Sequence, residues 1–276
     1  MMPPRVTLVL PAFNEAARLD GALDELFGYL DTQPDLAERL DVLVVDDGST
    51  DATAEIVTRR REASAASPAQ PRLAVLRVPH AGKGAAVRAG MLAARGDRLI
   101  FADADMAAPP DQLPLLLGAL DRVDVAIGSR IQPDGSDMRA SQPPLRRVLG
   151  RLFHLLAAAW VSGPIRDTQC GFKGFRREAA RDLFGRQRIT SIVFDVELIH
   201  LALRRNYRLE VVPIHWSDRR GSRMRARPGL AFQVAWDLFR IPLIHRNAGR
   251  AASTAATPLG SPPAGTGADA ERPASE

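Results

Sequence analysis

Asp103 and Asp105 end an apolar run that starts at Leu99, and one residue, Ala104, separates them. A turn at the end of a strand can bring two such carboxylates to one ligand, and carboxylate oxygens suit Mg²⁺ or Mn²⁺. An ion held in this way keeps several waters and adds phosphate oxygens of a substrate. The same spacing is compatible with two solvated loop aspartates, so other residues must decide between the two.

A second acidic group, Asp46 and Asp47, ends the apolar run that starts at Val42. The residues that follow, 48–51, have the composition of a turn and a helix cap. A cap explains Ser49 or Asp51, but it does not require Asp46 and Asp47 as well. Acids at this place can accept hydrogen bonds from ribose hydroxyls or from the N–H groups of a base.

A lysine between two glycines, Gly82-Lys83-Gly84, stands where a helix is expected to start. Backbone N–H groups and the helix dipole favour a phosphate there, and a lysine adds a point charge. The spacing is not that of a Walker A loop. Lys83 and Lys173 are the two lysines among 37 basic residues, and both lie next to glycines.

The elements that position these residues follow from short β-branched runs that alternate with amphipathic stretches. Helices are expected near 14–30, 51–65, 83–94 and 110–121. The expected strands of the first half are Val6–Leu10, Val42–Asp46, Leu73–Val78, Arg98–Ala102 and Asp124–Ile127. Strands that are apolar on both faces and alternate with helices predict a doubly wound, mostly parallel α/β sheet. Ligands bind beyond the carboxyl ends of such strands, where these polar groups lie.

The second half is less regular. Strands are expected at Gly171–Arg176 and Leu209–Pro213, with a helix near 192–205. Two amphipathic stretches, 145–160 and 230–243, are interpreted as core-facing helices. The alternative is docking on a membrane surface, with nearby arginines at anionic headgroups. The apolar stripe of the second stretch comprises Phe232, Ala235, Trp236, Phe239 and Leu243.

Composition excludes several classes of protein. The 276 residues are 46% hydrophobic, which is enough for a sizeable core. A single cysteine, Cys170, excludes a disulfide scaffold and is expected to be a small buried side chain. No apolar run reaches the roughly 18 residues of a membrane span, and the first residues do not resemble a signal peptide. We therefore expect a cytosolic chain with one domain over residues 1–250 and a disordered tail over 251–276.

Charge is divided unevenly along the chain. Residues 1–127 carry 13 basic and 19 acidic side chains, a net −6, whereas residues 128–250 carry 23 and 10, a net +13. The basic half is therefore expected to meet a polyanion. Aromatic residues make up only 5% and no helix-turn-helix pattern is present, so a nucleic-acid partner is not expected. A non-catalytic protein that only binds a ligand at these residues is disfavoured by the acids at the strand ends and by Lys83.

Together these motifs resemble the inverting nucleotide-sugar glycosyltransferases of family two, which have the Rossmann-like GT-A fold. The matching segments of the first half are 10–15, 44–51, 82–85, 102–105 and 128–130. Further segments at 166–173, 194–198, 216 and 221–223 resemble the dolichyl-phosphate β-glucosyltransferase branch. The related mannose synthases differ in the segment matched by Asp167 to Lys173. Eukaryotic members of the branch carry an N-terminal membrane anchor, which this sequence does not show.

The resemblance implies a role for each matching residue. The metal, Mg²⁺ or Mn²⁺, would bind Asp103 and Asp105. The residues implied to bind the nucleotide-sugar are Pro11, Ala12, Asn14, Glu15, Asp46, Asp47, Lys83, Gly84, Asp103, Ala104 and Asp105. The catalytic residues would be Asp103, Asp105, Asp167, Gln169 and Asp195. The residues implied at the acceptor phosphate are Arg130, Arg139, Arg147, Arg151, Ser222 and Arg223.

The implied reaction is inverting transfer of a sugar, glucose from UDP-glucose, to a polyprenyl or dolichyl phosphate. The enzyme would be peripheral on the cytoplasmic face of a membrane. GDP-mannose as donor, and an acceptor that is not a lipid, are the alternatives. Asp195 and Glu197 lie two apart on a helix and therefore do not form an acid/base pair. Glu197 is expected to be structural, Asp195 either contacts substrate or is structural, and Trp216 is either core or pocket wall.

Overall fold

A seven-stranded sheet forms the centre of the computed structural model, which describes residues 3–64, 72–138, 161, 165–217, 219 and 228–249. Its strands are β1 Val6–Ala12, β2 Leu40–Asp46, β3 Arg72–Arg77, β4 Arg98–Ala102, β5 Val125–Ser129, β6 Phe172–Arg176 and β7 Leu209–Pro213. The strand order is β3-β2-β1-β4-β6-β5-β7. All neighbours are parallel except that β6 runs antiparallel to both β4 and β5. The predicted α/β, mostly parallel sheet is therefore confirmed, with one reversed strand.

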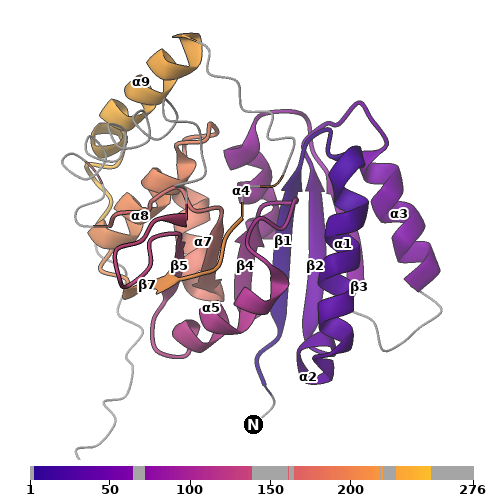
Figure 1. Cartoon of the computed structure of the whole chain (residues 1–276). Helices are drawn as coiled ribbons and strands as arrows, with labels where there is room; N and C mark the ends of the chain where they lie inside the picture. The colour runs from indigo at the N-terminus through magenta and orange to yellow at the C-terminus, as the bar shows by residue number, and fades with distance from the viewer. Residues whose placement is uncertain are drawn as a thin grey trace, which may run out of the picture.

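Helices cover both faces of the sheet (Figure 1). One face packs against α1 Ala16–Asp31, α3 Thr53–Ser64 and α5 Leu113–Leu120. Two short elements lie beside these helices in the sequence: α2 Pro34–Ala37 follows α1, and the 3-10 turn η1 Pro110–Gln112 precedes α5. The other face packs against α4 Lys83–Ala93, α7 Arg177–Arg186 and α8 Phe194–Arg204. The periodic leucines of α1 are buried because they form the stripe that a helix on a sheet requires.

All seven expected strands are present, and each lies within two residues of its predicted start and end. Helices α2 and α7 are not among the predicted elements. Half of the ten residues of α7 are charged. Its four buried residues alone therefore indicate an amphipathic helix only weakly. These are Ala179, Ala180, Leu183 and Phe184. The helix also follows β6 without an intervening turn residue, so the boundary carries no breaker signal.

The last described helix, α9 Pro228–Ile244, is turned the opposite way from the core-facing interpretation. Trp236, Phe239 and Leu243 are 50–53% exposed, whereas Asp237 is buried. The Ser191 hydroxyl donates a hydrogen bond of 2.6 Å to the Asp237 carboxylate, which fixes the polar residue inward. The core-facing prediction is therefore wrong for these three side chains. The predicted 145–160 helix and 251–276 tail lie outside the described residues.

Candidate active site

The loops that follow β1 and β2 are fastened to each other at the carboxyl edge of the sheet. Asn14 has a left-handed backbone with φ of 54°. Its N–H donates to the Ser49 hydroxyl at 2.9 Å, and its Oδ1 accepts from the Thr50 N–H at 2.8 Å. The Glu15 N–H donates to the Thr53 hydroxyl at 2.8 Å. Asn14 and Glu15, predicted to hold the nucleotide, thus also build the edge on which it would sit.

Asp46 and Asp47 are buried and accept hydrogen bonds from neighbouring backbone. Asp46 accepts from the Ser49 N–H at 3.0 Å. The Asp47 carboxylate accepts from the N–H groups of Ala81 at 2.9 Å and Gly82 at 3.1 Å. It therefore binds the loop before α4 to the end of β2. Contact of either side chain with ribose or base stays a prediction.

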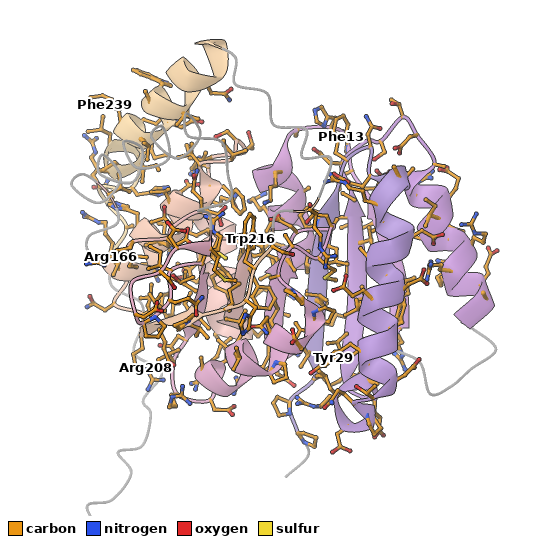
Figure 2. The ribbon with its side chains drawn as sticks, viewed as in Figure 1. Phe13, Tyr29, Arg166, Arg208, Trp216 and Phe239 are labelled. Atoms are coloured by element: carbon orange, nitrogen blue, oxygen red, sulfur yellow. The ribbon has the colours of Figure 1, made fainter. Side chains whose placement is uncertain are left out.

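An aromatic pair that the sequence reasoning missed lies beside Asp47. The rings of Phe13 and His80 stack with centroids 4.1 Å apart and planes at 18°. His80 Nδ1 lies 2.9 Å from an Asp47 oxygen. Phe13 is 40% exposed, at the end of the molecule towards which β1 and β2 point (Figure 2). The sequence offered one indication of this pair. Phe13 and His80 come just after β1 and β3, at the same ends of strands where the polar candidates lie.

Lys83 at the start of α4 forms an ion pair with Asp103 after β4. Burial disfavours the ammonium group, but Asp103, Asp195 and Asp105 outweigh burial and raise the pKa of Lys83 above its usual 10.5. The Gly84 N–H donates to the Thr190 carbonyl at 2.9 Å, and the Gly82 N–H is bound by Asp47. At this helix start the charged side chain, rather than those two N–H groups, faces the strand ends.

Asp105 lies next to a basic residue of α1. Arg18 donates to Asp105 at 3.2 Å and holds Glu15 through two further hydrogen bonds of 2.6 and 2.8 Å. Burial raises the pKa of Asp105, and the neighbouring Asp103 raises it further, while Arg18 opposes the rise.

The described residues contain no group of three or more histidine, cysteine or acidic side chains that could hold a metal. Asp103 and Asp105 alone fit a divalent cation that completes its shell with water and phosphate, because such a cation would relieve the repulsion between them. The metal site predicted at these two residues thus has a suitable pair of ligands, and occupation of it stays a prediction.

A buried ion pair joins β6 to α8 close to Lys83. Lys173 Nζ donates to Asp195 and to the Cys170 carbonyl, each at 2.6 Å. The two side chains are 1% and 4% exposed. Burial raises the pKa of Asp195, and Lys173 and then Lys83 oppose the rise. Asp195, which was predicted either to contact substrate or to be structural, is therefore already held in place by Lys173.

Arg130, predicted at the acceptor phosphate, makes two side-chain hydrogen bonds to Asp167, of 2.8 and 2.6 Å. The guanidinium lies 5.5 Å from the ring centroid of Trp216. Burial acts to lower the pKa of Arg130, but hydrogen bonding to Asp167 raises it. Trp216 is partly buried and thus packs against this pair in the middle of the molecule (Figure 2). Gln169, predicted to be catalytic, is partly buried, and a role for it stays a prediction.

The other residues predicted at the acceptor phosphate, Arg139, Arg147, Arg151, Ser222 and Arg223, lie outside the described residues. Pro11 and Ala12 end β1, and Ala104 stands between the two aspartates, so these three contribute backbone to the same edge. The described part of the site thus contains four ion pairs: Arg18–Asp105, Lys83–Asp103, Lys173–Asp195 and Arg130–Asp167.

Two predictions of a structural role are confirmed. Glu197 is fully buried and accepts from the N–H groups of Arg188 and Ile189 at 2.8 Å each. Its Oε1 also lies 2.6 Å from His245 Nε2. Cys170 is a buried free thiol, and burial raises its pKa to about 12, so it is not a ready nucleophile.

With this geometry established, similarity to known proteins decides the family. The model described as glycosyl transferase family 2 matches residues 7–184. The chain belongs to glycosyltransferase family 2. This glycosyltransferase is 38% identical over 250 residues to a dolichyl-phosphate beta-glucosyltransferase, ALG5C, of Trichomonas vaginalis, covering 87% of this chain and 71% of the relative. The dolichyl-phosphate beta-glucosyltransferase of Homo sapiens is 32% identical, with 80% and 69% covered.

Solved structures show the same fold. Glucosyl-3-phosphoglycerate synthase from Mycobacterium tuberculosis, in complex with UDP, superposes with a TM-score of 0.59 at 20% identity. The match covers 91% of this glycosyltransferase and 82% of that chain. The same synthase, in complex with Mn²⁺, UDP-glucose and phosphoglyceric acid, gives a TM-score of 0.60 at 19% identity. These likenesses confirm the GT-A fold.

Gly171 is a sensitive position of this glycosyltransferase. A Cβ atom added there would overlap the Asp103 carboxylate. Gly171→Ala is therefore expected to displace Asp103 and to lower kcat by about 100-fold, with a small change in Tm. Gly185→Ala, at a helical glycine whose added Cβ meets nothing within 4 Å, is the control. Wild-type turnover in Gly171→Ala would show that the position of Asp103 is not critical.

Proposed function

We propose that this glycosyltransferase transfers glucose from UDP-glucose to a polyprenyl phosphate and inverts the anomeric carbon. The observation that carries the proposal is the cluster of Lys83, Asp103 and Asp105 at the carboxyl edge of the sheet. The names of the most similar curated relatives supply the donor sugar and the class of acceptor.

In the proposed donor complex the diphosphate lies at the Lys83 ammonium, and the base lies by the exposed Phe13 ring. Asp103 and Asp105 would hold Mg²⁺ or Mn²⁺, which stabilises the charge that develops on the leaving nucleoside diphosphate. Both ions occur in complexes of the structurally similar synthase. Arg18 keeps Asp105 in place through its hydrogen bond, and Gly171 leaves room for Asp103.

The proposed acceptor needs little activation by a base. A phosphate monoester has a second pKa of about 6, so its oxygen is anionic near neutral pH. That oxygen attacks the anomeric carbon while the bond from this carbon to UDP breaks, and the electron pair leaves with UDP. Arg130 and the arginines of the second half balance the negative charge of the acceptor. Asp195, fixed by Lys173, is proposed to contact the sugar rather than to remove a proton.

We also propose that the enzyme works as a peripheral protein on the cytoplasmic face of a membrane, where a long polyprenyl chain is held. Among the described residues, no helix is both long and apolar enough to span a bilayer.

Turnover of UDP-glucose with polyprenyl phosphate and Mg²⁺ is the direct test. We expect release of UDP and formation of a glucosylated lipid phosphate, loss of both with EDTA, and recovery with excess Mg²⁺ or Mn²⁺. Parallel reactions with GDP-mannose and with 3-phosphoglycerate test the alternative donor and a non-lipid acceptor. Absence of turnover with every nucleotide-sugar would refute the proposal.

A further inference from the structure

Helix α9 presents three large apolar side chains outward. Trp236 and Leu243 are 53% exposed and Phe239 is 50% exposed. These positions recur at intervals of three and four residues, so they form one helical face. The Trp236 and Phe239 rings lie 6.1 Å apart and form a continuous aromatic surface. Ile244, 42% exposed, extends the apolar surface at the end of the helix. We call these four side chains the α9 outer face.

The opposite side of α9 is held in the core. Leu238 and Ile241 are buried against the same cluster as α8. Asp237 is bound by Ser191, and His245, just after the helix, lies 2.6 Å from Glu197. Buried carboxylates with such partners are costly to expose, so they fix the rotation of the helix. The outward position of the aromatic residues is thus a built feature of the fold.

Charge around the α9 outer face is of one sign. Asp237 is the only acidic residue of 228–249, and it is buried. Arg240 forms an ion pair of 3.0 Å with Asp237 and is still partly exposed beside the face. Arg246 is exposed after the helix. The sequence immediately before the helix, 220–227, adds four arginines and no acid. Apolar and aromatic residues bordered by arginines complement a surface that is apolar inside and anionic outside.

The face also lies at the appropriate end of the molecule. Helix α9 is found at the end towards which β1 and β2 point (Figure 1). Phe239 and Phe13, the latter at the candidate active site, both lie towards that end (Figure 2). A planar surface that contacts the α9 outer face can therefore be near the edge of the sheet where transfer would occur.

We propose that the α9 outer face lies in the interface of an anionic lipid bilayer, with Trp236, Phe239, Leu243 and Ile244 among the headgroups and upper acyl chains. Tryptophan is enriched at this depth of membranes because its ring is amphipathic. Arg240 and Arg246 contact lipid phosphates beside it. The inference rests on the proposed function, since a polyprenyl phosphate in the same bilayer is the acceptor that this docking would serve.

The test uses the full-length protein and two double variants. Trp236→Ser/Phe239→Ser removes the aromatic part of the α9 outer face. Leu115→Ser/Val211→Ser makes the matched change at side chains that are 45% and 43% exposed on α5 and β7. Sedimentation with vesicles of phosphatidylcholine and phosphatidylglycerol measures binding, and circular dichroism confirms that each variant is folded.

We expect the α9 variant to bind anionic vesicles about 10- to 100-fold more weakly than the wild type, and the control variant to bind as the wild type does. Wild-type binding to pure phosphatidylcholine should be weaker than to anionic vesicles. Equal binding of both variants and the wild type would overturn the inference. So would a wild-type dimer in analytical ultracentrifugation that the α9 variant alone disrupts, because a second copy would then cover the face.

Activity separates this inference from the proposed function. With a short-chain polyprenyl phosphate in detergent, the α9 variant should turn over as the wild type does. With a long-chain acceptor in anionic vesicles, its turnover should fall by about the same factor as its binding. Wild-type protein that binds vesicles but turns over neither acceptor would refute the proposed function and leave membrane docking supported. Equal turnover of both proteins on vesicles would refute the docking.

Discussion

Replacing Asp103 by asparagine is expected to lower kcat by about 100- to 1,000-fold, the cost of removing one group that stabilises charge on a leaving oxygen. Asp103 is the carboxylate that pairs with Lys83 and lies next to Asp105. The variant loses a ligand for the divalent cation and leaves Lys83 without its partner. Initial rates of UDP release at saturating UDP-glucose and Mg²⁺ measure the effect.

The control for this change is Asp31→Asn, which removes an equal charge from an exposed residue at the other end of α1. We expect it to retain wild-type turnover. Asp105→Ala should resemble Asp103→Asn in kcat, because the two carboxylates are expected to share one cation. If Asp103→Asn remains fully active while folded, the proposed metal site is wrong.

Breaking the buried pair of Lys173 and Asp195 is expected to have the largest effect on stability. Lys173→Met leaves a buried carboxylate with no counter-charge from β6, and such a loss costs about 3–5 kcal/mol in the free energy of unfolding. The pair is 1% and 4% exposed. Arg5→Met, which breaks an ion pair whose arginine is 49% exposed, should cost at most about 1 kcal/mol. Urea denaturation at pH 7 compares the two.

A second substitution and a second pH test the cause. Lys173→Met/Asp195→Leu removes both charges and is expected to recover most of the lost stability. In Lys173→Met the pKa of Asp195, already raised by burial, rises further. The folded state then binds a proton more readily than the unfolded state, so stability falls as pH rises above 3.8. The deficit should be smaller at pH 4 than at pH 7; equal deficits would contradict this account.

Much of the site could be predicted because it follows one rule of open α/β sheets. Polar residues after apolar runs meet at one edge, which brings Lys83 to Asp103 although 20 positions separate them. The partners within that edge could not be predicted. Asp47 is bound to the loop before α4 and Arg130 to Asp167 through side-chain rotamers that no sequence pattern encodes.

The orientation of α9 was not predictable for a related reason. Periodicity identifies which residues share a face, but a helix with apolar residues on two sides can bury either. Here hydrogen bonds from Ser191 and at Glu197, both distant in sequence, select the side that carries Asp237. The uneven charge along the chain, by contrast, is readable from the sequence and agrees with a basic border to this helix.

Strand β6 runs antiparallel to β4 and β5, and the site requires that its residues pair with the correct residues of these two strands. Lys173 lies opposite Phe101 in β4 and Ile127 in β5, on the sheet face that packs against α8. Side chains alternate between faces along a strand, so a shift of β6 by one residue would turn Lys173 into the apolar layer on the other face. That misaligned state would bury an unpaired ammonium group and leave Asp195 unpaired as well. The Lys173–Asp195 ion pair therefore disfavours a shifted register of β6, and it selects the correct strand register as well as holding the site together.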